Sequence, residues 1–279
     1  MNAAIQPMQQ KPKLGQHFLS STQARQQIVD ALGDISACTV VEIGPGRGAI
    51  TDILAQHANH LVAVELDREL APILAVRYAL AANVRVLPAD ILQVSLAELR
   101  VTNKADDLIV VGNLPYYITS DILLWLFTQI GDFSRAVFMM QEEVADRITA
   151  PSGGSEYGLL SATTQLHVHA EKLFFLPPGA FSPPPKVNSA VVRLHPAPRF
   201  AQLGVERQPF LFFLRGCFQQ KRKTLSNNLR TAGYAPEQIV TALQAASLSP
   251  NIRAEGIALE EMAQVFLSLH PADLFSEKK

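Results

Sequence analysis

The sequence predicts an α/β fold, in which a mostly parallel sheet with crossover helices precedes a small all-helical C-terminal domain. Short apolar runs alternate with segments whose apolar residues recur every three to four positions, the pattern of parallel strands joined by helices. Beyond Pro196-Ala197-Pro198 the apolar spacing is helical throughout. We therefore expect one domain over residues 1–198 and a helical domain over residues 199–279.

Seven apolar runs have the length of buried strands. We expect these strands near residues 39–43, 61–65, 84–88, 108–112, 135–140, 164–170 and 189–194. The segment that begins at Thr119 places Ile122 and Leu126 on one face and predicts a helix. A second helix is expected over residues 141–149, because Pro151-Ser152-Gly153-Gly154 would end it.

Composition excludes several classes of protein. Apolar residues make up 48% of the 279 residues and charged residues 18%, so a substantial core is expected. No apolar run has membrane-spanning length, and residues 1–10, expected to be a loose tail like residues 276–279, contain no signal region. Cys38 and Cys217 form no CxxC pair, so neither a metal site nor a disulfide framework is expected, and a cytoplasmic location fits.

Charge is unevenly distributed along the chain. The net charge of −1 argues against a surface coated with positive charge for nucleic acid. Residues 199–230, however, contain seven Lys and Arg residues and the single acid Glu206. The run Lys221-Arg222-Lys223 in this segment is most simply a solvated helical face. Because further basic residues extend the patch, the sequence favours RNA contact.

A glycine-rich turn follows the first predicted strand. Gly44-Pro45-Gly46-Arg47-Gly48 comes directly after the apolar run and before a predicted helix. Glycine lets a ligand approach the backbone, and a helix start offers free N–H groups. The spacing is GxGxG rather than GxGxxG, and Pro45 removes a donor. A ligand without a pyrophosphate is therefore favoured over a dinucleotide.

Three polar residues stand at the ends of the next three predicted parallel strands. These residues are Glu65, Asp90 and Asn113. Such strand ends share one edge of the sheet, where ligands bind. A carboxylate at Glu65 suits two ribose hydroxyls, and Asp90 suits an adenine amine. Each residue alone is more often a solvated acid or a turn former. Together with the glycine-rich turn after the first strand, however, they place suitable groups at four successive strand ends, which indicates a ligand site.

The motif Asn113-Leu114-Pro115-Tyr116 combines an amide, a rigid carbonyl and a ring. The Asn113 side chain and the Leu114 carbonyl can accept hydrogen bonds from an adenine amine and turn its lone pair outward. Tyr116 can stack on the base, which contributes about 1–3 kcal/mol. Alone, the motif is more often an ordinary Asn-x-Pro turn. The strand-end residues beside it favour an adenine site.

Together these residues resemble the small-subunit (16S) rRNA adenine N6-dimethyltransferase family, in its KsgA/RsmA branch. The resemblance covers roughly residues 11–270 in unbroken order, which is more specific than any single motif. The matching motifs are Leu14-Gly15-Gln16-His17-Phe18-Leu19, Glu42-x-Gly44-x-Gly46-x-Gly48, Asn113-Leu114-Pro115-Tyr116, Phe181-x-Pro183-x-Pro185-Lys186-Val187-x-Ser189 and Lys221-Arg222-Lys223-Thr224-Leu225-x-Asn227-Asn228-Leu229.

The resemblance implies a fold, a reaction and a set of contacts. The fold is a seven-stranded Rossmann-like methyltransferase sheet with one antiparallel edge strand and a small helical domain. The cofactor is S-adenosylmethionine, and the substrate is a pair of adjacent adenines in the 3′-terminal hairpin of 16S rRNA, within an immature 30S subunit. The implied cofactor contacts are His17, Leu19, Gly44, Glu65, Asp90 and Asn113. The target base would lie against Asn113, Leu114, Pro115 and Tyr116, with Phe181 as a second aromatic surface.

Other functions remain open from the residues alone. Methylation of 23S rRNA or of DNA adenine uses the same Asn-x-Pro-Tyr corner, although the segment 181–189 and the basic run favour the small subunit. A ribosome-assembly factor without catalysis could keep the same fold, and the intact ligand-site residues argue against it. A nicotinamide-dependent dehydrogenase is disfavoured by the glycine spacing. No metal is expected, and the protein is expected to be a monomer.

Overall fold

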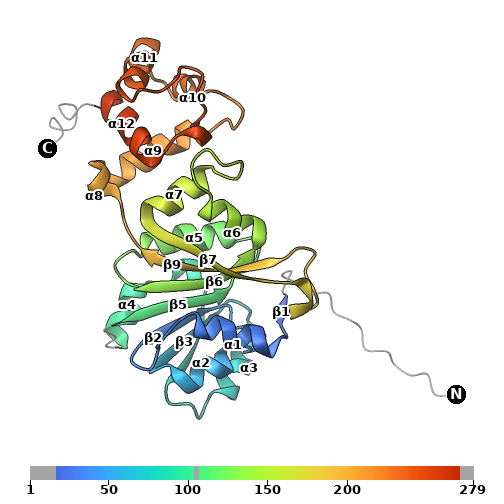
Figure 1. Ribbon diagram of the computed structural model, residues 1–279. Helices are drawn as coiled ribbons and strands as arrows, with labels where there is room; N and C mark the ends of the chain where they lie inside the picture. The colour runs from blue at the N-terminus through green and yellow to red at the C-terminus, as the bar shows by residue number, and fades with distance from the viewer. Residues whose placement is uncertain (1–16, 104–106, 271–279) are drawn as a thin grey trace.

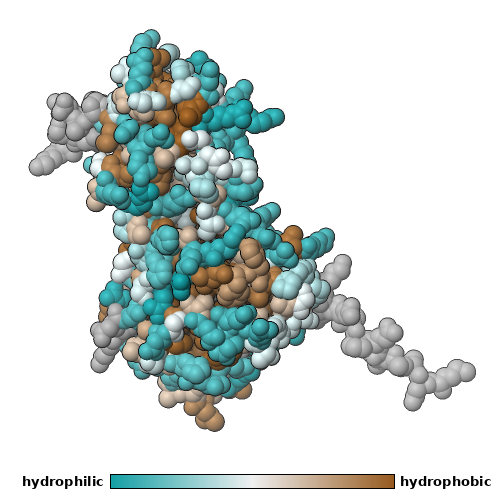
Figure 2. All heavy atoms as spheres, viewed as in Figure 1, coloured by the Kyte–Doolittle hydropathy of each residue, from teal (hydrophilic) through white to brown (hydrophobic). Residues whose placement is uncertain are grey.

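The computed structural model describes residues 17–103 and 107–270, so both expected tails lie outside the described residues. In the α/β part, helices surround a large mixed sheet (Figure 1). The C-terminal residues form a separate group of helices that stacks at one end of the α/β part. The visible face is largely polar, with an apolar area over the α/β part (Figure 2). Among the described helices, none combines the length and apolar character needed to cross a membrane.

The described residues form a seven-stranded sheet with the order β4-β3-β2-β5-β6-β9-β7. Its strands are β2 (Thr39–Ile43), β3 (His60–Glu65), β4 (Val84–Pro88), β5 (Leu108–Asn113), β6 (Arg135–Gln141), β7 (Val168–Leu176) and β9 (Ser189–Pro196). The first five pair in parallel register, as alternation with helices predicts. Six of the seven predicted segments coincide with these strands.

The antiparallel strand lies one place in from the edge. β9 pairs antiparallel with both β6 and β7, so β7 is the edge strand and runs in the same direction as β6. The chain turns back through residues 177–188, and the returning β9 fills the place next to β6. The expectation of an antiparallel edge strand is corrected accordingly.

The predicted strand over 164–170 is also corrected. Residues up to His167 belong to helix α7 (Leu159–His167), and the strand begins at Val168. The β-branched pair Thr163-Thr164 favours a strand locally. Ala162 and Leu166, however, are buried four positions apart, and the Thr164 hydroxyl donates to the Leu160 carbonyl at 2.8 Å. Packing of this helical face therefore overrides the local preference.

Helices cover both faces of the sheet. The remaining helices of the α/β part are α1 (Thr22–Asp30), α2 (Thr51–His57), α3 (Leu70–Arg77), α4 (Leu96–Thr102), α5 (Thr119–Thr128) and α6 (Glu142–Thr149). Successive residues of a strand point to opposite faces. Val110 accordingly packs in the core beneath α4, α5 and α6, and Val111 in the core beneath α1 and α2. The two cores fix the strand ends that carry the site.

The C-terminal helices have a core of their own. They are α8 (Phe200–Leu203), α9 (Arg207–Cys217), α10 (Leu225–Thr231), α11 (Pro236–Ala245) and α12 (Leu259–Leu269). Aromatic rings of α9 and α12 meet there, with the Phe210 and Phe266 centroids 5.3 Å apart. This core also takes in Tyr157 and Leu166, which precede residue 198. The division at residue 198 stays a prediction, and helix α7 packs with both parts.

Candidate active site

One pocket lies at the carboxyl ends of the parallel strands β2, β3, β4 and β5. Nine of the residues singled out from the sequence line it: His17, Leu19, Gly44, Glu65, Asp90, Asn113, Leu114, Pro115 and Tyr116. Register explains the gathering, because Ile43 pairs with both Val64 and Gly112, next to Glu65 and Asn113. The pocket is open to solvent and contains about 1090 Å³ of empty space when its mouth is included.

The glycine-rich turn and Glu65 form one rigid unit. The Glu65 carboxylate accepts the Gly46 N–H at Oε2 and the Asp67 N–H at Oε1, each at 2.9 Å. Gly44 has a φ of +64°, and a Cβ built there would meet no atom within 4 Å, so its backbone faces open space. A side chain at this position would fill the pocket instead of a ligand.

Asp90 is held in place by the start of a 3₁₀ turn. Its Oδ1 accepts the Leu92 N–H at 3.0 Å and caps the turn Ile91–Gln93. Its other oxygen accepts none of the hydrogen bonds found among the described residues. A carboxylate oxygen can accept about two hydrogen bonds, so Asp90 and Glu65 both keep lone pairs for a ligand.

Glu42 is a buried acid beside the same pocket. It is 2% exposed, and its Oε2 has no hydrogen-bond partner among the described residues. Burial, with a smaller contribution from the negative charges of Glu65 and Asp52, raises the pKa of this carboxyl from 4.5 to about 8. Glu42 is therefore protonated at neutral pH, whereas the sequence singled it out only as part of the glycine motif.

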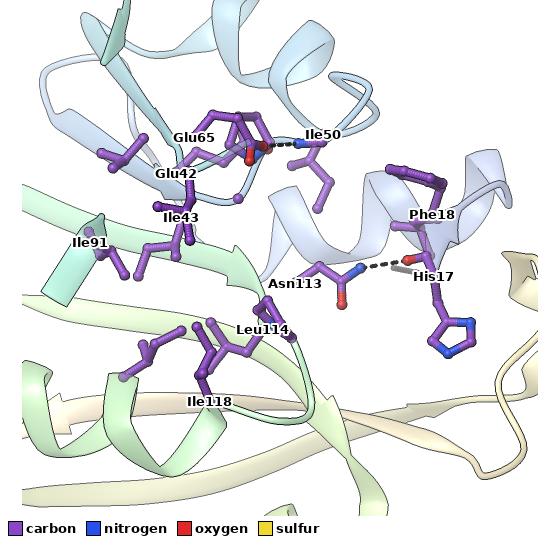
Figure 3. A pocket seen from close by; sticks show the side chains of 18 of the residues that line it. His17, Phe18, Glu42, Ile43, Ile50, Glu65, Ile91, Asn113, Leu114 and Ile118 are labelled. Atoms are coloured by element: carbon purple, nitrogen blue, oxygen red, sulfur yellow. Dashed lines mark hydrogen bonds between the residues drawn. The ribbon is translucent and has the colours of Figure 1, made fainter. Parts of the chain in front are cut away.

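Asn113 is oriented by the segment that precedes the sheet. Its amide nitrogen donates to the backbone carbonyl of His17 at 3.0 Å. Figure 3 shows the amide oxygen turned away from His17. This contact assigns the nitrogen as the donor, and the oxygen remains as an acceptor. The Leu114 carbonyl likewise accepts no hydrogen bond found among the described residues, so two acceptors remain at this corner.

Tyr116 is fixed through its hydroxyl. The hydroxyl lies 3.0 Å from the Ser189 hydroxyl at the start of β9, and the ring centroid lies 5.6 Å from that of His17. The Pro115 carbonyl accepts the Thr119 hydroxyl at 3.0 Å and the Ile118 N–H at 3.2 Å. The turn into α5 is thus held at several points, which suits a preformed binding surface.

A short strap closes one side of the pocket. Strand β1 (Phe18–Leu19) pairs antiparallel with β8 (Phe181–Ser182), and His17 Nδ1 lies 2.8 Å from the Pro183 carbonyl oxygen. The Phe18 ring approaches the glycine turn, because a Cβ at Gly46 would lie 3.2 Å from it. The Arg47 guanidinium lies 4.4 Å from the centroid of the same ring, a cation–π contact. The sequence singled out Phe18 only as part of the motif from Leu14 to Leu19.

Phe181 lies outside the pocket. Its side chain is 4% exposed and packs in the core with Leu19, its neighbour across the β1–β8 pair. It is not among the described residues that line the pocket. The structure therefore corrects its predicted position as a second aromatic surface, since the Pro-rich segment turns this ring into the core.

Lys221, Arg222 and Lys223 are exposed in the loop between α9 and α10. They do not lie on a helix, which corrects the simplest interpretation of the run. Arg215 on α9 and Arg230 on α10 are exposed as well, so a basic surface on the C-terminal helices is distinct from the pocket.

The residues present fit S-adenosylmethionine. This molecule carries two ribose hydroxyls and an adenine amine but no phosphate. The acceptors left at Glu65 and Asp90 suit those groups, and the open backbone at Gly44 leaves space for the remainder. No cluster of three or more His, Cys, Asp or Glu side chains able to hold a metal was found among the described residues.

The sheet order, the glycine turn and the acids at the next two strand ends define an S-adenosylmethionine-dependent methyltransferase. Residues 8–270 match the model of the family described as ribosomal RNA adenine dimethylase. The chain belongs to this family and is an rRNA methyltransferase.

Curated relatives agree with this assignment, and solved structures agree with the fold. The ribosomal RNA small subunit methyltransferase A of Acidobacterium capsulatum is 53% identical, covering 93% of this chain and 91% of the relative. The protein of the same name from Koribacter versatilis is 52% identical, covering 93% and 94%. A dimethyladenosine transferase from Plasmodium falciparum has a TM-score of 0.74 at 24% identity over 89% of this chain and 96% of that one. The 23S rRNA methyltransferase ErmE has a TM-score of 0.67 at 24% identity over 90% and 99%. These two structures show the fold.

Proposed function

We propose that this chain transfers methyl groups from S-adenosylmethionine to N6 of two adjacent adenines in the 3′-terminal hairpin of 16S rRNA. The observation that carries the proposal is the single pocket that joins the acids Glu65 and Asp90 to the Asn113–Tyr116 corner. Relatives above 50% identity that bear the small-subunit name support the choice of rRNA. The proposed substrate is an immature 30S subunit, and the enzyme acts as a cytoplasmic monomer.

The chain's own residues orient the amine. S-adenosylmethionine, when bound, supplies an activated methyl group, so no metal is required. The Asn113 oxygen and the Leu114 carbonyl accept hydrogen bonds from the two N–H groups of the adenine amine. The nitrogen lone pair is thereby turned away from these two acceptors. The Asn113 oxygen is available because the amide nitrogen of Asn113 already donates its hydrogen bond to the His17 carbonyl. Preorganised acceptors of this kind need no rearrangement during the reaction.

Tyr116 provides the face against which the base stacks. Because its hydroxyl contacts Ser189, the ring is already held before RNA arrives. The target adenine must leave its own stack, and an aromatic surface offsets part of that loss. The corner residues Asn113, Leu114, Pro115 and Tyr116 supply no strong general base of their own. The amine proton is therefore expected to pass to water after transfer.

The basic surface of the C-terminal helices is the proposed RNA contact. Lys221, Arg222 and Lys223 are exposed and take part in none of the ion pairs found among the described residues. Their charges are therefore available to phosphates. Replacing all three by Gln should weaken RNA binding and flatten its dependence on salt, since each phosphate contact adds roughly one unit to that slope. Arg85→Gln on edge strand β4 is the matched control. An unchanged slope in the triple variant would remove the patch from the proposal.

The function is tested by transfer of labelled methyl groups. The substrates are small subunits from a strain that lacks this enzyme, naked 23S rRNA and duplex DNA. We expect dimethylated adenine in the small subunits only, and a loss of roughly 10²–10³-fold with Asn113→Ala. Label confined to 23S rRNA or to DNA would replace the proposed substrate. A protein that ignores S-adenosylmethionine in calorimetry would instead be a non-catalytic assembly factor.

A further inference from the structure

Tyr117 is a large aromatic residue at the mouth of the pocket that the proposed mechanism does not use. It belongs to the pocket lining, yet its side chain is 58% exposed. None of the hydrogen bonds or ring contacts found among the described residues involves its side chain. Its ring is therefore available on the rim, next to the ring of Tyr116 in the sequence.

The backbone that carries Tyr117 is well fixed. The Pro115 carbonyl accepts both the Ile118 N–H and the Thr119 hydroxyl, and Thr119 is 2% exposed at the start of α5. Tyr116 on one side is tied to Ser189. The turn thus holds two successive aromatic residues, with the first anchored to β9 and the second exposed to solvent. A ring on a fixed backbone loses little entropy when it stacks on a ligand.

We propose that Tyr117 stacks on the nucleobase next to the target adenine and holds the RNA strand at the mouth of the pocket. The inference rests on the proposed function and names a specificity-determining residue for it. Removing a base from a strand also leaves its neighbour without a stacking partner. An exposed ring on the rim restores that partner. The neighbour in the proposed substrate is a second adenine, whose large face stacks well.

The contact predicts a measurable loss. Stacking of one base on an aromatic side chain contributes about 1–3 kcal/mol, which corresponds to roughly 5- to 150-fold in kcat/KM. Tyr117→Ala should lose this amount, mainly through a higher KM. Tyr117→Phe keeps the ring and should restore the wild-type value. Leu124→Ala is the matched control, because Leu124 on α5 is also exposed, at 43%, but is not among the pocket-lining residues.

The experiment pairs each variant with two substrates. Methyl transfer is measured on small subunits that carry both adenines, and on reconstituted subunits in which uracil replaces the neighbouring adenine. Uracil stacks less well, so we expect it to slow the wild-type protein but to change Tyr117→Ala little. Calorimetry with S-adenosylmethionine should give the same Kd for all variants, which also verifies folding.

Each alternative outcome is decisive. A Tyr117→Ala protein whose kcat/KM matches the wild type overturns the inference. The inference is also overturned if the uracil substitution lowers kcat/KM by the same factor in Tyr117→Ala as in the wild type, because the two effects would then be independent. A weaker Kd for S-adenosylmethionine would show that the ring contacts the cofactor instead. A wild-type protein that transfers no methyl group to small subunits would overturn the proposed function and this inference together. The wild-type result alone therefore distinguishes the two failures.

Discussion

Replacing Glu42 by Gln should change how the stability of this protein depends on pH. Glu42 is 2% exposed and has a pKa raised by burial to about 8, against an ordinary value of 4.5. Between these two values the unfolded chain loses its proton from this carboxyl, whereas the folded chain keeps it. Folding then requires proton uptake, and stability falls as pH rises.

The size of the effect follows from the two pKa values. From pH 4.5 to pH 7, the fall in unfolding free energy that comes from Glu42 is about 3 kcal/mol, at about 1.4 kcal/mol for each unit. Stability from this group is fully present below pH 4.5 and is lost as pH rises towards 8. Glutamine has nearly the same shape and does not titrate, so the variant lacks this slope.

Urea denaturation at several pH values between 4.5 and 7 measures the difference. It is done without S-adenosylmethionine, whose positive charge would favour the ionised form of Glu42. All other titrating groups cancel when the Glu42→Gln curve is subtracted from the wild-type curve. Glu143→Gln, which removes an exposed acid on α6, should run parallel to the wild type. Parallel curves for Glu42→Gln as well would show that Glu42 is ionised in the folded protein and would refute the reasoning.

Four further variants at three positions test the site. Gly48→Ala should destabilise the protein by roughly 2–4 kcal/mol in urea denaturation, because φ is +81° and a Cβ would lie 2.8 Å from the Tyr78 hydroxyl; a wild-type midpoint would contradict this. Gly44→Ala places alanine at a φ of +64° without a clash, so we expect a loss of only about 1–2 kcal/mol in stability. The same variant should bind S-adenosylmethionine with a clearly higher Kd in calorimetry, and unchanged binding would place the ligand elsewhere. Tyr116→Phe loses the contact with Ser189 and should slow methyl transfer by at most about tenfold, whereas Tyr116→Ala also loses stacking and should slow it by roughly 5- to 150-fold more. Equal rates for the two variants would exclude stacking.

Local sequence was sufficient where pattern and packing agree. The parallel strands β2, β3, β5 and β6 were predictable because each is largely a continuous apolar run buried on both faces, whereas the edge strand β4 is only partly buried. The ligand residues at their ends followed from the rule that parallel strands present their carboxyl ends together. At Thr163-Thr164 the same reasoning failed, because this segment is kept helical by packing against α5 and α6 as well as against the C-terminal helices.

The sequence by itself determined the parallel strands of the sheet, the position of the glycine turn and the set of polar groups at one edge, because these depend on residue spacing and on the direction of neighbouring strands. Only the tertiary structure decided which atom of Asn113 faces the pocket, since the His17 carbonyl that orients it lies 96 positions away in the chain. It also decided that Phe181 is buried and that Tyr117 is exposed. Phe181 belongs to one of the motifs and Tyr117 directly follows another, and their difference in exposure arises from how the β1–β8 pair and the start of α5 pack.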